Sequence, residues 1–138
     1  MDCYCIVYVS EATVLLGEPE LLRLLQQARA EHEQASLTGV LLYSEGQFLQ
    51  VLEGPTEPVR EFFARIAADP RHCKLEVLAD GPRPARDFSH WHFSTLLPER
   101  YDQLPNYRPL PQLLATTETT HVYSLLHDFL TQRYIPLY

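Results

Sequence analysis

Residues 37–54, LTGVLLYSEGQFLQVLEG, decide the fold of this chain. Val40 to Tyr43 and Gln47 to Glu53 are rich in apolar, β-branched and aromatic residues, which is the composition typical of strands. Between them, Ser44-Glu45-Gly46 supplies a glycine that tolerates the positive φ of a tight turn. The stretch therefore predicts an antiparallel β-hairpin.

The segments on either side of this hairpin alternate between strand and helix patterns. Strand composition recurs three times, and each of two helical segments carries apolar side chains at helical spacing on one face. The predicted elements are strands at Tyr4 to Val9, Leu75 to Leu78 and Trp91 to Thr95, a loop over residues 10–17, and helices from Glu18 to near Glu33 and from about Pro58 to Ala68.

The resulting order is βαββαββ. Helix crossovers joined to an antiparallel hairpin predict an α+β, ferredoxin-like mixed sheet with both helices on one face. The other face also needs cover, and a last helix with an apolar stripe can supply it. We expect residues 1–97 to form the core and residues 98–138 to be a C-terminal helical extension packed on the sheet. The stripe consists of Val122, Leu125, Leu126, Phe129 and Leu130.

The composition argues against several classes of protein. A net charge of −7 disfavours nucleic-acid binding, which requires a basic surface. No apolar run approaches the ~20 residues of a membrane span, and the first residues do not resemble a signal peptide. We therefore expect a cytoplasmic protein that has no membrane association and keeps its cysteines reduced. Cys3 and Cys5 are too close for the usual zinc-ligand spacing, so no metal site is predicted.

Gln50 is unusual because an amide in the middle of an apolar strand is costly unless it is hydrogen-bonded. Side chains alternate along a strand, so Phe48, Gln50 and Leu52 share one face. Tyr8 of the first strand could meet Gln50 across the sheet. Two readings are equally open at this point: a Tyr–Gln pair that satisfies itself in the core, or part of a ligand site.

Three further features have ordinary structural explanations. His32 ends the apolar stripe of the first predicted helix, where a lone histidine is more often a partly exposed capping residue than a ligand contact. Asp69-Pro70-Arg71-His72 follows the second predicted helix, and basic residues there ordinarily compensate the helix dipole. Trp91, between His90 and His92, is ordinarily a core anchor. None of these features alone predicts a function.

Together, however, these segments resemble one family, the BLUF domains, which are blue-light sensors that use FAD. The resemblance extends over about residues 4–96, and five ordered segments at the family's spacing rarely coincide. The helical tail is also similar to the family's C-terminal cap. The matching segments are Ile6 to Ser10, Leu37 to Tyr43, Phe48 to Gly54, Asp69 to His72, and Arg86-Asp87-Phe88 with Trp91.

The resemblance implies a function and a set of site residues. A flavin, either FAD or FMN in its place, would bind non-covalently between the two helices, against the sheet face that carries Tyr8 and Gln50. Tyr8 would donate an electron and a proton to the photoexcited flavin. Gln50 would bridge Tyr8 to the flavin N5 and O4 and then rearrange its amide, which shifts the absorption to the red. The implied flavin contacts are Tyr8, His32, Phe48, Gln50, Arg65, Ile66, Asp69, Arg71 and His72.

The resemblance also implies how the signal would leave the site. It would pass from Gln50 through Trp91 and Phe93 of the fifth predicted strand to the C-terminal helices. We expect no effector domain, so the output would go to a separate downstream protein or to a change of homo-oligomer. We also expect no enzymatic activity, because the acidic and histidine residues are accompanied by no nucleophile motif.

Two positions depart from the family's pattern. His32 stands where the family usually has Asn, whose amide holds the O4 and N3–H edge of the flavin. An imidazole has its donor and acceptor on opposite sides of the ring, so it can make only one of those two bonds. Phe93 stands where Met is common, which removes a flexible sulfur beside the Gln50 amide. These changes favour a second hypothesis, a degenerate, flavin-free protein-interaction module.

Overall fold

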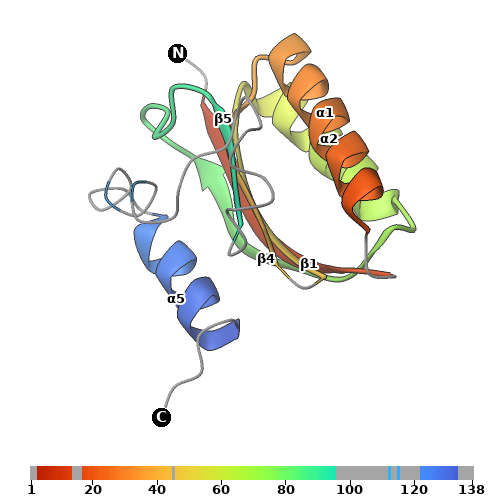
Figure 1. Cartoon of the computed structure of the whole chain (residues 1–138). Coiled ribbons are helices and arrows are strands. Elements are labelled where there is room, and N and C mark those ends of the chain that lie inside the picture. Colours follow the sequence, from red (N-terminus) through yellow and green to blue (C-terminus); the bar gives the residue numbers. More distant parts are fainter. Residues whose placement is uncertain are drawn as a thin grey trace.

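The computed structural model describes residues 3–13, 17–44, 46–95, 112, 115 and 122–133. A five-stranded mixed sheet has two helices on one face and a third helix on the other (Figure 1). This arrangement confirms the α+β, ferredoxin-like fold. The elements are β1 (Tyr4–Ala12), α1 (Glu18–Gln34), β2 (Thr38–Ser44), β3 (Gln47–Gly54), α2 (Thr56–Ala68), β4 (His72–Pro82), β5 (Trp91–Thr95) and α5 (Tyr123–Arg133).

The strand order β4-β1-β3-β2-β5 places β3 at the centre of the sheet. All neighbouring strands are antiparallel except β2 and β5, which are parallel. In this register Gln50 of β3 lies directly between Tyr8 of β1 and Leu41 of β2. The predicted meeting of Tyr8 and Gln50 across the sheet is therefore confirmed.

The two faces of the sheet bury separate cores because side chains alternate along each strand. On one face, α1 and α2 pack over β1, β2 and β3 (Figure 1). On the other face, Val122, Leu126 and Phe129 of the α5 region are buried against residues such as Val7, Val40 and Val51, and Leu125 packs at the edge. The side chain of Leu130 lies outside the described part of the chain.

Gly39 allows the start of β2 to lie tightly against β3. Its φ is +142°, and a Cβ built there would lie 1.9 Å from the carbonyl oxygen of Val51. Because that oxygen belongs to the backbone of the central strand, no side-chain adjustment could relieve the clash. A glycine is therefore required at position 39 by this close approach.

Several predicted boundaries were wrong by a few residues. β1 continues to Ala12, where a loop was predicted from Ser10, because Glu11 pairs with Gln47 and Ala12 pairs with His72. β4 is correspondingly longer than predicted and starts at His72. In each case pairing with a neighbouring strand extends a segment whose own composition is weakly β-forming.

The helices also begin or end slightly outside their predicted limits, with α2 starting at Thr56 rather than Pro58. Most of residues 98–121 lie outside the described part, so the boundary at residues 97 and 98 stays a prediction. No helix in the described ranges is long and apolar enough to cross a bilayer. Within those ranges, no three His, Cys, Asp or Glu side chains are grouped as a metal site would require.

Candidate functional site

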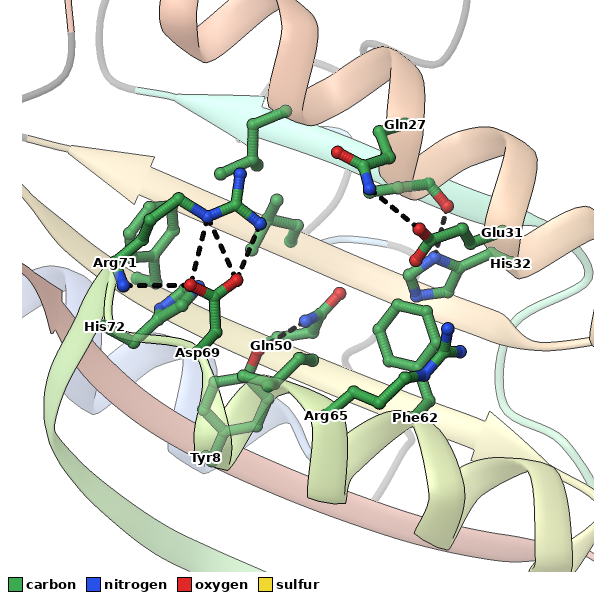
Figure 2. Close-up of a pocket in the computed structure, with 15 residues that line it drawn as sticks. Tyr8, Gln27, Glu31, His32, Gln50, Phe62, Arg65, Asp69, Arg71 and His72 are labelled. Carbon is green, nitrogen blue, oxygen red and sulfur yellow. Dashed lines mark hydrogen bonds and ion pairs between the residues drawn. The ribbon is translucent and has the colours of Figure 1, made fainter.

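A cavity of about 240 Å³ lies between α1 and α2, with the sheet as its floor (Figure 2). Its walls combine apolar side chains with a small number of polar ones, as small-molecule sites usually do. The lining residues are Tyr8, Leu24, Gln27, Ala28, Glu31, His32, Leu41, Phe48, Gln50, Phe62, Arg65, Ile66, Asp69, Arg71 and His72. All nine residues predicted from the resemblance are among them.

The floor of the cavity carries a buried Tyr8–Gln50 pair. The Gln50 Nε2 and the Tyr8 hydroxyl oxygen are 2.5 Å apart, and the two side chains are only 4% and 1% exposed. The Tyr8 ring packs edge-on against Phe63, at 5.6 Å between ring centroids. Burial raises the pKa of the Tyr8 phenol well above its ordinary value, so the hydroxyl keeps its proton at neutral pH.

His32 is fully buried in the wall formed by α1, which makes the reading as a partly exposed capping residue wrong. Its Nδ1 lies 2.5 Å from the carbonyl oxygen of Ala28. A carbonyl can only accept, so Nδ1 carries the proton and Nε2 presents a lone pair. The imidazole packs against Phe62 and Trp91, with ring centroids 4.5 and 5.1 Å away.

Burial also decides the charge of His32. It lowers the pKa of the imidazole to about 4, although the Ala28 carbonyl, the Glu31 carboxylate and the Gln50 amide all raise it. The side chain is therefore neutral at pH 7. Its Nε2 is buried and has no hydrogen-bond partner among the described residues, and the same holds for Oε1 of Gln50. The cavity thus contains two buried acceptors that have no donor among the described residues.

The neutral His32 makes stability depend on pH. An unfolded chain protonates this imidazole near 6.5 and the folded chain only near 4. Between these values the unfolded state binds the extra proton, so the free energy of unfolding falls as the pH falls. We expect His32 to lower the free energy of unfolding by about 2 kcal/mol between pH 7.5 and pH 5.

Urea unfolding of the wild type and of His32→Asn at both pH values measures this contribution as the difference between their losses. His72, whose pKa is also lowered by burial, is present in both proteins and cancels. Equal losses in the two proteins would show that the imidazole is not buried in its neutral form.

The mouth of the cavity carries the charged groups. Arg71 binds the Asp69 carboxylate through Nε at 3.0 Å and through a terminal nitrogen at 2.6 Å, and this pairing lowers the pKa of Asp69. The Arg65 guanidinium lies 5.2 Å from the centroid of the Phe62 ring. Glu31 accepts a hydrogen bond from Gln27. Two guanidinium groups and two carboxylates therefore line the cavity, while its Tyr8–Gln50 floor is uncharged.

His72 and Phe48 form the wall nearest to Asp69. The His72 Nδ1 lies 3.1 Å from the hydroxyl of Ser10, and its ring centroid is 5.0 Å from that of Phe48. Arg71 and His72 thus do more than compensate the dipole of α2, because both line the cavity together with Asp69.

Trp91 and Phe93, the two predicted signalling residues, are buried beside α1 in the cluster that includes Leu21 and Leu41. Neither lines the cavity. Two contacts join the cavity to β5: the Trp91 ring packs on that of His32, and Phe93 pairs across the sheet with Leu41, which lines the cavity.

Some cavity residues were missed because apolar side chains were assigned to the core. Leu24, Ala28 and Phe62 follow the helical spacing of buried stripes, and Leu41 belongs to an apolar strand. Periodicity shows which face of a helix is covered but does not distinguish contact with a ligand from contact with protein. The sequence did contain a signal for the polar side chains of this wall. Gln27 precedes Glu31 by one helical turn, so the two side chains lie next to each other on α1 beside the apolar stripe.

Known proteins resemble this chain in sequence. The family model described as sensors of blue-light using FAD matches residues 3–94. The photoactivated adenylate cyclase subunit beta of Euglena gracilis is 32% identical over 133 residues, which is 91% of this chain and 15% of that protein. The blue light- and temperature-regulated antirepressor BluF of Escherichia coli is 39% identical over 61 residues, 44% of this chain and 15% of that protein. The chain thus spans about 15% of the length of either relative.

Solved structures of BLUF proteins also resemble this chain. The dark-state structure of BlrB, a BLUF protein, is 25% identical with a TM-score of 0.62 and covers 90% of this chain and 83% of that one. The BLUF structure of BlrP1 has a TM-score of 0.71 at 24% identity, covers 94% of this chain and 90% of that one, and supports the fold. The chain belongs to the BLUF family, whose members are flavin-binding sensor domains for blue light rather than catalytic domains.

Proposed function

We propose that this chain senses blue light through FAD bound non-covalently in the cavity between α1 and α2, with Tyr8 and Gln50 as the photochemical pair. The observation that carries the proposal is the buried hydrogen bond between these two side chains in the cavity floor. A pair that served only the core would not need to form the floor of an open cavity beside a second acceptor with no partner.

The cavity suits the ring system of a flavin. Its volume of about 240 Å³ lies just below the roughly 300–1,000 Å³ of typical ligand sites, so it fits a ring system and leaves the rest of a dinucleotide outside. The oxidised flavin ring has one N–H, at N3, and His32 Nε2 is an acceptor without a partner. The Arg65 guanidinium suits a phosphate-bearing chain, which FAD and FMN share, whereas Arg71 is already paired with Asp69.

Each residue of the floor has a defined task in this proposal. Bound flavin supplies the absorption of blue light and a strong electron acceptor. Tyr8 would give an electron and its phenolic proton to the excited flavin and recover both when the pair recombines, and burial keeps the phenol protonated in the dark. Gln50 passes the proton and then exchanges its hydrogen bonds, because a carboxamide has a donor end and an acceptor end of nearly equal size.

Output would leave through His32, Trp91 and β5 towards the helical extension. The relatives named above are a cyclase subunit and an antirepressor, and each is far longer than this chain. We propose that a separate downstream protein, or a homo-oligomer of this chain, receives the signal. A cytoplasmic location is consistent with such a partner.

Reconstitution tests the proposal. The purified chain is mixed with FAD, with FMN or with riboflavin, and absorption spectra are recorded in the dark and after blue light. We expect a bound flavin whose absorption shifts reversibly to the red, with FAD and FMN retained more strongly than riboflavin because they carry phosphate. A bound flavin with an unchanged spectrum after illumination would refute the photoreceptor role and retain only flavin binding.

His32 predicts that flavin binding is weaker than the pocket could support. Its Nε2 can accept from N3–H, but its only N–H is already donated to Ala28. An asparagine amide can accept and donate together, so His32→Asn should gain one hydrogen bond and bind FAD about tenfold more tightly. Titration by quenching of flavin fluorescence measures the Kd. His90→Asn, the same exchange at an exposed position, should leave the Kd unchanged; equal values for all three proteins would contradict this reading.

The flavin-free interaction module remains the second candidate, because the buried His32 acceptor and Phe93 both depart from the family's pattern. It predicts that added FAD leaves the Tm unchanged, since only a ligand that favours the native state raises it. A Tm that rises with FAD concentration would eliminate this candidate.

A further inference from the structure

Two buried acceptors approach each other across the cavity. With Nε2 of Gln50 donating to Tyr8, the Oε1 end of the carboxamide is directed towards the side of the cavity that holds His32 (Figure 2). Both side chains line the same cavity, the carboxamide on its floor and the imidazole on its α1 wall. In this orientation neither Oε1 of Gln50 nor Nε2 of His32 has a donor among the described residues.

The His32 ring cannot supply the missing hydrogen-bond donor. Its Nδ1 proton is fixed by the Ala28 carbonyl at 2.5 Å, so Nε2 has only a lone pair to offer. Phe62 and Trp91 both pack against the ring, which opposes a turn that would exchange its two nitrogens. Protonation would supply a donor, but burial keeps the imidazole neutral at pH 7.

The Gln50 carboxamide can supply this donor, because turning the amide by about half a turn exchanges an oxygen and a nitrogen of similar size. Nε2–H then donates to His32 Nε2, and Oε1 accepts from the Tyr8 hydroxyl. Tyr8 can take part in either orientation, since a hydroxyl both donates and accepts. His32, whose Nε2 can only accept, distinguishes the two ends of the amide.

We infer that His32 is a positioning residue that selects the orientation of the Gln50 carboxamide, holding its nitrogen towards the imidazole and its oxygen towards Tyr8. The result is a directed chain of hydrogen bonds in which Tyr8 donates to Gln50, Gln50 to His32 and His32 to the Ala28 carbonyl. A ring that enters the cavity competes with Gln50 for the same imidazole nitrogen. The inference rests on the proposed function only for its consequence, because Gln50 is the residue whose amide is proposed to rearrange.

The orientation can be measured in the full chain without flavin. Nitrogen-15 NMR at pH 7 reports which His32 nitrogen is protonated, and a scalar coupling across the hydrogen bond reports whether Gln50 Nε2 donates to His32 Nε2. Gln50→Leu identifies the amide signals by their disappearance. We expect Nδ1 protonated, Nε2 bare, and a resolved nitrogen–nitrogen coupling in the wild type and in His90→Asn. His32→Asn should retain folded amide spectra and lose the coupling.

The outcomes separate this inference from the proposed function. A wild-type chain with native-like spectra but no coupling, or with a proton on His32 Nε2, would overturn the inference even if FAD gave a normal light response. A clear coupling in a chain that shows no light response with FAD would support the inference and refute the photoreceptor role. The wild-type measurement is decisive by itself should His32→Asn fail to fold.

Discussion

Tyr8→Phe is expected to abolish the light-induced red shift while leaving flavin bound. The substitution keeps the ring that packs at 5.6 Å on Phe63 but removes the hydroxyl that pairs with Gln50. Phenylalanine is far harder to oxidise than tyrosine and has no proton to give, so the photochemical step loses its donor. The cost in stability should be about 1 kcal/mol, which is the usual net effect of one lost hydrogen bond.

Tyr43→Phe provides the matched control. Tyr43 is also buried, lies in the neighbouring strand β2, and packs against Phe48 at 4.7 Å, but it does not line the cavity. Its loss of a hydroxyl should leave the spectral shift intact. Light and dark spectra of both variants, at equal flavin occupancy, make the comparison; a normal shift in Tyr8→Phe would remove Tyr8 from the mechanism.

Glu53→Leu is expected to destabilise the fold by about 3–5 kcal/mol. Glu53 is fully buried at the end of β3, and its carboxylate accepts from the backbone N–H groups of Asp87 and Phe88 and from the Thr38 hydroxyl. Arg86 donates in turn to Thr38 at 3.0 Å. Leucine fills a similar volume but leaves three donors, one buried and two partly buried, without the carboxylate as acceptor.

The urea midpoint measures this effect, and Glu61→Leu on the exposed side of α2 is the control, with an expected change of less than about 0.5 kcal/mol. A change below about 1 kcal/mol in Glu53→Leu would mean that water replaces the carboxylate. Because Phe88 lies close before β5, the same network fixes the approach to Trp91, so loss of Glu53 should also weaken the coupling of the cavity to β5.

The hairpin of residues 37–54 and the Tyr8–Gln50 pair could be predicted from the sequence because both depend on local patterns. Strand alternation places Gln50 on a defined face, and the βαββαββ order leaves β1 as the partner of β3. The ends of β1 and β4 could not be predicted, since the pairing of Ala12 with His72 depends on contacts between segments far apart in sequence.

The burial and the tautomer of His32 could not be predicted from the sequence either. Its burial and tautomer depend on Phe62 and Trp91, which come from other elements, and on the Ala28 carbonyl that its rotamer reaches. Spacing placed His32 on the buried stripe of α1, but the statistics of lone helical histidines favoured exposure. The chemistry of the cavity wall therefore required the three-dimensional arrangement.

The most direct test of the central claim is the light-minus-dark infrared spectrum of the chain loaded with FAD. It is recorded with carbon-13 tyrosine, with nitrogen-15 glutamine, and without label. The account predicts difference bands that shift with each label and disappear in Tyr8→Phe, because the Tyr8–Gln50 hydrogen bond of 2.5 Å is the element that changes. A loaded chain whose difference bands respond to neither label would contradict it.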